Sequence, residues 1–248
     1  RAEGTKESDR HMVRASTLEK ALRSRSTIKA DQKAALEYLT TGKGAIQCVS
    51  GMAGTGKTFM LDAARECWER DGYRVLGCAL AARAALQLEA ESGIKSCSVE
   101  SLLYRADPEA KELLKHHAKQ FGRALKGQNT YAWKKPRLDE KTILVIDEAG
   151  MVGTEKLERL ITLIAVAGGK AVLVGDERQL QAIEAGGAFA SLRKRLGGVE
   201  LQSITRQNEE WMRQAVRQFA DGDARGALTH SALAERLHGE PAINAADT

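Results

Sequence analysis

The chain has 248 residues, of which 43% are hydrophobic and 29% charged, and these shares are typical of a globular protein with a full core. Its apolar runs fall well short of the ~20 residues that a membrane helix needs, and no secretory leader pattern stands at its start. We therefore expect no membrane segment, and because residue 1 is not Met we interpret the chain as a fragment or a processed product. The net charge of +5 is compatible with a polyanionic partner but identifies none.

The four cysteines show neither a disulfide framework nor a metal-binding pattern. Cys48, Cys67, Cys78 and Cys97 form no C-x-x-C pair and have no histidine partner at metal-ligand spacing. Cys48 and Cys78 fall in apolar runs, where a reduced thiol behaves as a small hydrophobic group. Because reduced cysteines persist in a reducing compartment, we expect a cytoplasmic protein.

The first 26 residues form a lead-in segment that we expect to be partly disordered or helical. It is polar and without apolar periodicity up to about residue 15, which predicts fraying, and a short helix follows near residues 17–23. A stronger helix opens at residues 27–32 and ends at the glycine-containing residues 41–44. One side of this helix carries Gln32, Ala35, Leu36 and Leu39.

Residues 45–58 (AIQCVSGMAGTGKT) combine a short apolar strand with a P-loop of the form G-x-x-x-x-G-K-S/T. Glycines allow the backbone N–H groups to turn toward phosphate, and the following helix directs its positive end at the same anion. We expect Lys57 to neutralise the β- and γ-phosphates and the Thr58 hydroxyl to hold Mg²⁺. The alternative, a glycine-rich turn with a surface lysine, is disfavoured by the flanking strand and helix. The loop residues assigned to nucleotide binding are Gly51, Ala53, Gly54, Thr55, Gly56, Lys57 and Thr58.

The sequence after the P-loop predicts a helix, a strand and a second helix. Met60, Ala64 and Trp68 recur at helical spacing. Residues 73–80 read as a buried strand, and residues 81–91 as a helix that a serine–glycine pair closes.

Residues 104–141 differ in composition from their surroundings. A polar helix rich in lysine and histidine is predicted at 109–125, and a loop follows at 127–141. Aromatic and basic side chains together can stack bases and hold phosphates, so this loop is either a DNA contact or a solvated connection. Its aromatic and basic residues are Tyr131, Trp133, Lys134, Lys135 and Arg137.

The remaining elements complete an α/β pattern. Alternating strands and helices predict a parallel sheet of about five strands flanked by helices, in a single domain. The continuous apolar run at 142–146 is typical of a strand covered on both faces. The other expected elements are a helix at 154–167, strands at 170–175 and 199–204, a helix capped by Asn208 with Met212, Ala215, Val216 and Phe219 on one face, and a last helix at about 224–237.

Asp147 and Glu148 follow the apolar run at 142–146, at the edge where open α/β sheets bind their ligands. Asp147 can hold the Mg²⁺ that Thr58 also contacts, and Glu148 can orient or deprotonate the attacking water. The alternative is a strand that ends in two solvated acids, which the upstream P-loop disfavours. Gln179 and Arg206 follow the next two strands and could reach the γ-phosphate. Without the other motifs, each would be interpreted as an ordinary surface residue.

Together these motifs resemble the first motor domain of superfamily 1 DNA helicases of the RecD-like branch. The chain is most similar to the helicase part of TraA-type conjugative relaxases, which nick and unwind plasmid DNA for transfer. The resemblance covers roughly residues 27–239. It rests on IKADQ (28–32), SGMAGTGKT (50–58), GCALAARAALQLEAESGI (77–94), SVESLL (98–103), VIDEAGM (145–151), VGDERQLQAIEAG (174–186) and ITRQ (204–207).

The resemblance implies a RecA-like P-loop NTPase fold and roles for several residues. Gln32 would recognise adenine, Gln179 would couple the γ-phosphate to DNA binding, and Arg206 would act as an arginine finger within the chain. Residues 80–84 fall where the family touches single-stranded DNA. This sequence carries alanines there in place of the family's Pro-Thr-Gly. The remaining candidates for DNA contact in this segment are its backbone groups or Arg83. Ser98 and Ser101 would be further DNA contacts.

The predicted function is that of an ATP-binding and ATP-hydrolysing motor domain that acts on single-stranded DNA with Mg²⁺. The resemblance divides the chain into a lead-in (1–26), a RecA-like ATPase domain (27–207) and a helical pair (208–248) that leads to a second RecA-like domain, absent here. We therefore expect low activity from this chain alone. No relaxase His-x-His cluster is present in the sequence. A recombination or repair helicase, or a nucleotide-gated DNA-binding module without useful turnover, remains an alternative.

Overall fold

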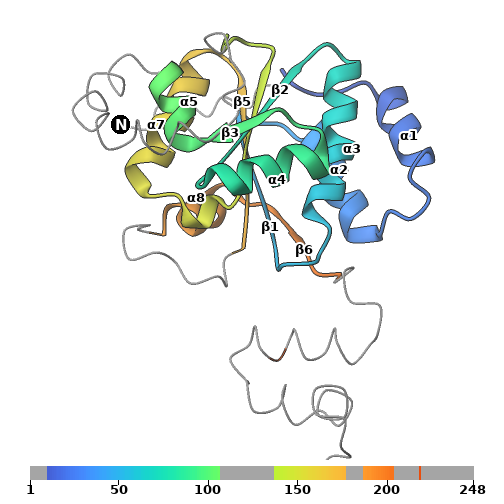
Figure 1. Cartoon of the computed structure of the whole chain (residues 1–248). Helices are drawn as coiled ribbons and strands as arrows, with labels where there is room; N and C mark the ends of the chain where they lie inside the picture. Colours follow the sequence, from blue (N-terminus) through green and yellow to red (C-terminus); the bar gives the residue numbers. More distant parts are fainter. Residues whose placement is uncertain (1–9, 107–136, 177–186, 204–217, 219–248) are drawn as a thin grey trace, which may run out of the picture.

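This computed structural model describes residues 10–106, 137–176, 187–203 and 218 (Figure 1). Several predictions lie outside the described residues. They concern the helix at 109–125, most of the loop at 127–141, Gln179, Arg206 and the helical pair at 208–248.

Six parallel strands form one sheet in the order β3-β2-β4-β5-β1-β6. The predicted α/β fold with a parallel sheet is confirmed, and the described sheet has one strand, β3, that the sequence pattern did not predict. Every residue of β4 and β5 is buried, as expected of strands covered on both faces. The strands are β1 (Ile46–Gly51), β2 (Arg74–Ala79), β3 (Ser96–Ser98), β4 (Thr142–Ile146), β5 (Lys170–Gly175) and β6 (Val199–Leu201).

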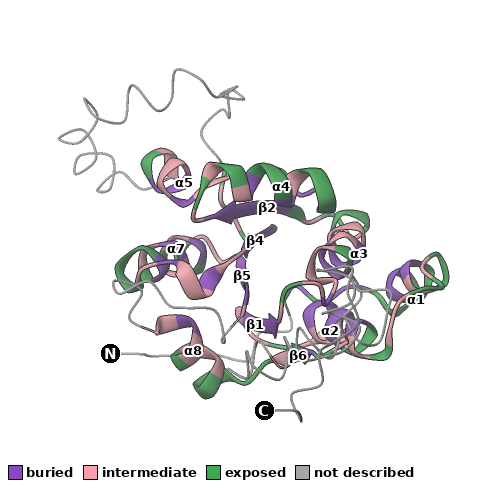
Figure 2. Ribbon diagram, turned by 60° about the horizontal axis from the view of Figure 1, so that its bottom comes forward, coloured by how far each residue is buried: buried purple, intermediate pink, exposed green. Residues whose placement is uncertain are grey.

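Helices cover both faces of the sheet. The described helices are α1 (Ala15–Arg23), α2 (Ala30–Thr41), α3 (Lys57–Arg70), α4 (Ala82–Ser92), α5 (Val99–Ala106), α7 (Thr154–Val166) and α8 (Ala188–Leu196), with a short 3₁₀ turn η1 (Ala149–Met151). Helices α1, α2 and α3 lie on one face and α5, α7 and α8 on the other (Figure 2). Helices α5 and α8 were not predicted.

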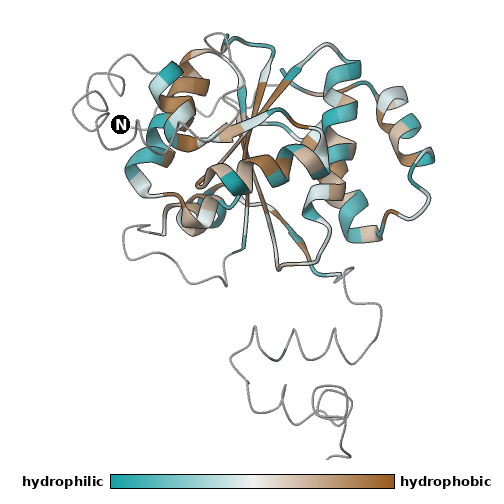
Figure 3. Cartoon of the chain, viewed as in Figure 1, coloured by the Kyte–Doolittle hydropathy of each residue, from teal (hydrophilic) through white to brown (hydrophobic). Residues whose placement is uncertain are grey.

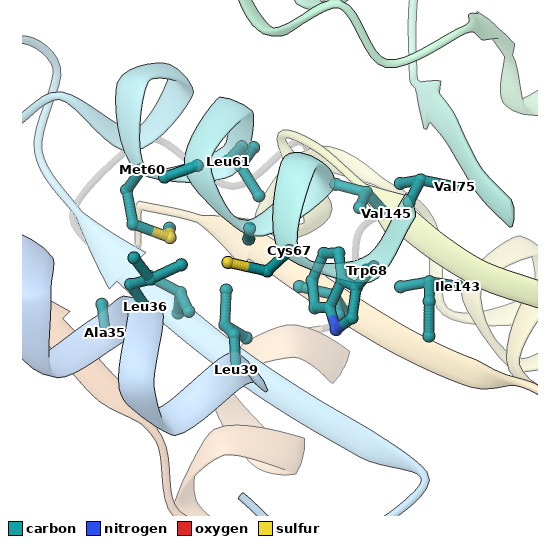
Figure 4. Packing of buried hydrophobic residues seen from close by; sticks show 14 of the residues in the cluster. Ala35, Leu36, Leu39, Met60, Leu61, Cys67, Trp68, Val75, Ile143 and Val145 are labelled. Carbon is teal, nitrogen blue, oxygen red and sulfur yellow. The ribbon is translucent and has the colours of Figure 1, made fainter. Parts of the chain in front are cut away.

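The core has two halves because successive side chains of a strand point to opposite faces. In β4, Ile143 and Val145 join the α2–α3 side, whereas Leu144 and Ile146 join the α5–α7–α8 side. Hydrophobic residues accordingly gather on the strands, while the helices carry hydrophilic residues on part of their surface (Figure 3). On the first side, Leu36 and Leu39 of α2 pack with α3 around the fully buried Trp68 (Figure 4).

The described end of the lead-in packs against the domain. His11 and Val13 are buried; the backbone N–H of Val13 donates to the Thr40 carbonyl (2.8 Å), and His11 Nε2 donates to the Glu140 carbonyl (2.9 Å). The prediction of fraying up to about residue 15 is therefore wrong for His11 and Val13. Two buried side chains in a mostly polar stretch are too few to give a periodic signal. Across the described residues, no helix is long and apolar enough to cross a membrane.

Candidate nucleotide site

A cleft of about 420 Å³ opens at the carboxyl ends of β1, β4 and β5. The P-loop contributes Lys57 and Thr58 from the start of α3, and β4 contributes Asp147 and Glu148. Seven of the predicted site residues, from segments about 90 positions apart in the sequence, therefore meet in one cavity. The cleft is lined by Ala53, Gly54, Gly56, Lys57, Thr58, Phe59, Asp62, Ala84, Gln87, Leu88, Glu91, Asp147, Glu148, Gly175 and Asp176.

The P-loop takes a shape that requires its glycines. Gly54 and Gly56 have φ angles of +82° and +78°, in the left-handed region that side chains rarely adopt. At Gly51 a Cβ atom would lie 2.7 Å from Thr55 Oγ1 and 2.9 Å from Leu201 Cβ, so no larger residue fits without displacing the loop or β6. Lys57 Nζ donates to the Gly51 carbonyl at 2.5 Å and to the Met52 carbonyl at 3.0 Å. The loop thus holds its lysine at the mouth of a glycine-lined cradle.

The acid pair is fixed by the sheet and by an unusual backbone turn. The Asp147 N–H donates to the Cys78 carbonyl of β2 (2.8 Å), which continues the ladder by one residue. Burial raises the pKa of Asp147, while the Glu148 backbone N–H and the Lys57 ammonium oppose that shift. Glu148 has a φ of +51°, so the chain turns sharply directly after Asp147.

The donor set fits a hydrated magnesium ion beside a triphosphate. The Thr58 hydroxyl and the Asp147 carboxylate are hard oxygen ligands on the same cleft, and Mg²⁺ is commonly bound by one or two such groups together with phosphate oxygens. A cation there would also favour the charged form of the Asp147 carboxylate, whose burial otherwise disfavours it.

Seven cleft residues carried no functional prediction from the sequence. Two of them are Gly175, the last residue of β5, and Asp176, which directly follows it. Asp176 could have been found, because it ends a strand next to the one that carries Asp147. The others come from α3 and α4, which pack together and form one wall of the cleft. Their positions depend on helix packing, and no local pattern indicates them. They are Phe59, Asp62, Gln87, Leu88 and Glu91, whereas Ala84 belongs to the predicted DNA-binding segment at 80–84.

Gln32 does not line the cleft. Its side chain is 2% exposed, its Nε2 donates to the Thr55 carbonyl (3.0 Å), and its Oε1 accepts from the Lys29 N–H (3.1 Å). The amide therefore supports the P-loop from behind in this structure, and adenine recognition by Gln32 stays a prediction.

The predicted DNA-binding residues lie at the ends of neighbouring strands. Arg83 is exposed at the start of α4, after β2, and Ser98 ends the adjacent β3. Ser98 Oγ accepts the Ser101 N–H at 3.3 Å, so this serine also caps α5. Arg83 is therefore the most accessible of the three, and their role in DNA binding stays a prediction.

Comparisons with known proteins agree with this arrangement. The conjugal transfer protein TraA of Rhizobium radiobacter is 40% identical over 230 residues, which are 92% of this chain and 18% of the relative. TraA of Agrobacterium fabrum is 38% identical over 232 residues, 93% of this chain and 18% of the relative. This chain therefore spans about a fifth of the length of these relatives. The resemblance to TraA-type proteins is confirmed.

The fold has a counterpart among solved structures. The Pif1 helicase from Candida albicans superposes with a TM-score of 0.53 and 22% identity, covering 80% of this chain and 46% of that one. The predicted RecA-like P-loop fold is confirmed by this likeness together with the parallel sheet. Residues 27–242 match the AAA domain family, and because this match covers most of the chain, the chain belongs to that family.

Proposed function

We propose that this chain is the ATP-binding and ATP-hydrolysing motor domain of a DNA helicase that works within a conjugative transfer protein. The observation that carries the proposal is the meeting of Lys57, Thr58, Asp147 and Glu148 in one cleft. A phosphate cradle, two oxygen ligands for magnesium and a carboxylate base are the parts that nucleotide hydrolysis needs.

The P-loop binds the phosphates of ATP. Its backbone N–H groups and the positive end of α3 favour the anion, and the Lys57 ammonium exchanges its two loop carbonyls for phosphate oxygens. Thr58 and Asp147 would hold Mg²⁺, which would supply positive charge to the β- and γ-phosphates.

Glu148 acts on the attacking water. Its carboxylate accepts a proton as the water oxygen bonds to the γ-phosphorus, and the bond to the β–γ bridging oxygen breaks to release ADP. Arg206 stabilises the charge that spreads over the transferred phosphoryl group. Gln179 couples the presence of the γ-phosphate to DNA binding. These last two roles rest on the sequence resemblance.

The DNA-related part of the proposal rests on the relatives. Similarity to TraA over most of the chain favours single-stranded plasmid DNA as the track, with Arg83 as a contact. A second RecA-like domain would complete the motor, and its opening and closing would move the protein along DNA. Free cysteines at all four positions suit a cytoplasmic setting.

Lys57→Ala tests the nucleotide site. We expect it to weaken ATP binding at least about ten-fold, because the variant removes the ammonium that the P-loop supplies to the phosphates. Titration of the purified chain with a fluorescent ATP analogue in Mg²⁺ measures this. Lys33→Ala is the matched control, since Lys33 is exposed on α2 and outside the cleft. Unchanged affinity in the Lys57 variant would contradict the assignment.

A recombination or repair helicase and a nucleotide-gated binding module are the competing functions. Similarity to conjugal transfer proteins favours the motor of a transfer protein over a recombination or repair helicase. Glu148 in the cleft favours a hydrolase over a nucleotide-gated binding module, because nucleotide binding alone requires no base. Phosphate release measured with and without single-stranded DNA separates a motor from a binding module.

A further inference from the structure

The lead-in segment reaches the wall of the nucleotide cleft through one arginine. Arg25 follows the end of α1, which packs beside α3 (Figure 2). Its guanidinium binds two acids of α3: Nη2 donates to Asp62 Oδ2 at 2.8 Å, and Nη1 donates to Glu66 Oε2 at 2.5 Å. The Arg25 side chain is only 12% exposed, so solvent screens these ion pairs less than pairs at an open surface. Since Asp62 lines the cleft, the arginine lies directly behind the cleft wall.

Asp62 lies one helical turn beyond Thr58, the candidate magnesium ligand. Residues four positions apart share one face of a helix, with Cβ atoms about 5–6 Å apart, and both of these side chains line the cleft. A carboxylate at this distance from the magnesium and phosphate site would repel the phosphates unless its charge is balanced.

Two arginines bind the two oxygens of the Asp62 carboxylate. Arg65 Nη2 donates to Oδ1 at 2.7 Å, while Arg25 binds Oδ2. Burial of the carboxylate opposes its charge, but the hydrogen bonds from Arg25 and Arg65 outweigh burial, so the pKa of Asp62 lies below its ordinary value. Asp62 is therefore ionised at neutral pH, and the two guanidinium groups, rather than a proton, balance its charge.

The two arginines differ in what else they hold. Arg65 Nε donates to the Ser92 carbonyl at 2.8 Å, and a Cβ atom on Gly93 would lie 3.0 Å from the same nitrogen. Arg65 therefore joins α3 to the end of α4, and its removal would disturb the packing of the cleft wall. Arg25 binds Asp62 from the side of α1, so its removal changes the charge and leaves the bond between α3 and α4 in place.

The described lining of the cleft has an excess of negative charge. It contains five carboxylates and one ammonium group, an arrangement that by itself disfavours a triphosphate. Neutralisation of one carboxylate from behind the wall reduces that excess. The charged lining residues are Asp62, Glu91, Asp147, Glu148 and Asp176, together with Lys57.

We propose that Arg25 is a positioning residue for the nucleotide site, because it holds and neutralises Asp62 so that the cleft wall accepts the phosphates of ATP. The lead-in segment is then part of the nucleotide site, although the sequence predicts an ATPase domain that begins only at residue 27. This inference rests on the proposed nucleotide-binding function.

Arg25→Met tests the inference on the purified chain, with affinities for fluorescent ATP and ADP analogues measured separately in Mg²⁺. The variant leaves Asp62 with one guanidinium, so we expect ATP affinity to fall about three- to ten-fold. ADP affinity should fall less, because the magnesium complex of ADP carries less negative charge than that of ATP. Both losses should shrink between about 50 mM and about 500 mM KCl, because salt screens the repulsion.

Asp62→Asn supplies the test of mechanism. The amide removes the negative charge that Arg25 balances, so this variant should bind ATP at least as tightly as the unaltered chain. If Arg25 acts through that charge, the double variant with Arg25→Met should bind ATP within about two-fold of Asp62→Asn alone. A purely structural role of Arg25 predicts no such rescue.

Arg14→Met is the matched control. The Arg14 guanidinium donates to Asp71 Oδ1 at 2.8 Å, and Asp71 directly follows α3. This pair also joins the lead-in segment to α3, but at the end of the helix away from the P-loop, and neither residue lines the cleft. The variant should leave both nucleotide affinities and their salt dependence unchanged.

The outcomes separate the inference from the proposed function. If Lys57→Ala weakens ATP binding and Arg25→Met does not, the positioning role is wrong and the proposed function stands. Equal losses of ATP and ADP affinity in Arg25→Met, without rescue by Asp62→Asn, would reduce Arg25 to a general support of the fold and overturn the inference. If the unaltered chain binds neither nucleotide, the proposed function fails, and the inference fails with it.

Discussion

Glu148 adopts a left-handed backbone conformation directly after the strand that carries Asp147. Such a conformation costs a non-glycine residue about 1–3 kcal/mol and persists where the surroundings impose it. Here the turn starts η1, which packs against the end of β5: a Cβ on Gly150 would lie 3.3 Å from the Asp176 carbonyl. Adjacent residues on one strand end can therefore serve different atoms of a bound nucleotide, one the metal and the other the water.

Glu148→Gln should separate binding from hydrolysis. The amide keeps the shape of the side chain but cannot accept the proton, so we expect ATP affinity within about two-fold of the original and phosphate release slowed by about 10²- to 10⁴-fold. Single-turnover phosphate release measures the rate. Glu155→Gln, on the exposed start of α7, is the control and should change neither quantity. Fast release by the Glu148 variant would assign the base to another residue.

At the scale of elements, α2 has a packing role and a site role. Leu36 and Leu39 bury one side of it against α3, and Asp31 and Gln32 connect its first turn to β6 and the P-loop. Because the packing fixes the helix, it also fixes the two polar side chains at its start. The elements that were not predicted are β3, α5 and α8, and β3 forms by pairing with β2, a contact that no pattern along the chain specifies.

Leu39→Ala should destabilise the domain by about 2–5 kcal/mol. The side chain is fully buried, so its removal leaves a cavity between α2 and α3. Urea unfolding followed by circular dichroism measures the free energy of unfolding. Leu86→Ala is the matched control, because Leu86 is 59% exposed on α4 and the same change there should cost less than about 0.5 kcal/mol. Similar costs at both positions would contradict the core described here.

On the scale of the whole molecule, the two edges of the sheet have different chemistry. The carboxyl ends of the strands form the cleft, whereas the amino end of β5 carries Lys170, a fully buried lysine whose Nζ donates to the Leu39 carbonyl at 2.8 Å. Burial lowers the pKa of Lys170 to about 7. The edge away from the cleft therefore carries a buried amine whose cost in stability depends on pH.

Stability should rise with pH between about 7 and 9. In the unfolded chain Lys170 stays protonated up to its ordinary pKa of 10.5, so over this window the unfolded state binds more protons and the free energy of unfolding increases by up to about 1.4 kcal/mol per pH unit. The lowered pKa of His11 affects the free energy of unfolding at pH values below 7. The Cys67 and Cys97 thiols, with pKa values raised to about 11, act above this window in the opposite sense.

Lys170→Met should remove this dependence. Urea unfolding at pH 7 and pH 9 measures the slope, which we expect to be flatter in the variant, together with a gain in stability at pH 7. Lys141→Met, at an exposed position near the same edge, should keep the original slope. An equal slope in the Lys170 variant would mean that the buried amine does not control it.

The sequence alone determined the features that depend on local order along the chain. The P-loop spacing at Gly51–Thr58, the apolar strands and the acid pair after β4 predicted a parallel α/β fold and most of the phosphate end of the site. This works because a parallel sheet brings the carboxyl ends of its strands to one edge, so motifs far apart in the sequence meet there.

Only the tertiary structure decided what depends on packing between elements. It seated Gln32 behind the P-loop, placed Asp62 and Gln87 in the cleft wall, and joined Asp31 to the chain after β6. A helical pattern specifies which side of a helix is apolar, but the backbone groups that a polar side chain meets depend on how neighbouring elements pack. That is why the sequence predicted the candidate catalytic groups, and only the fold revealed side chains such as Gln32 that support the P-loop.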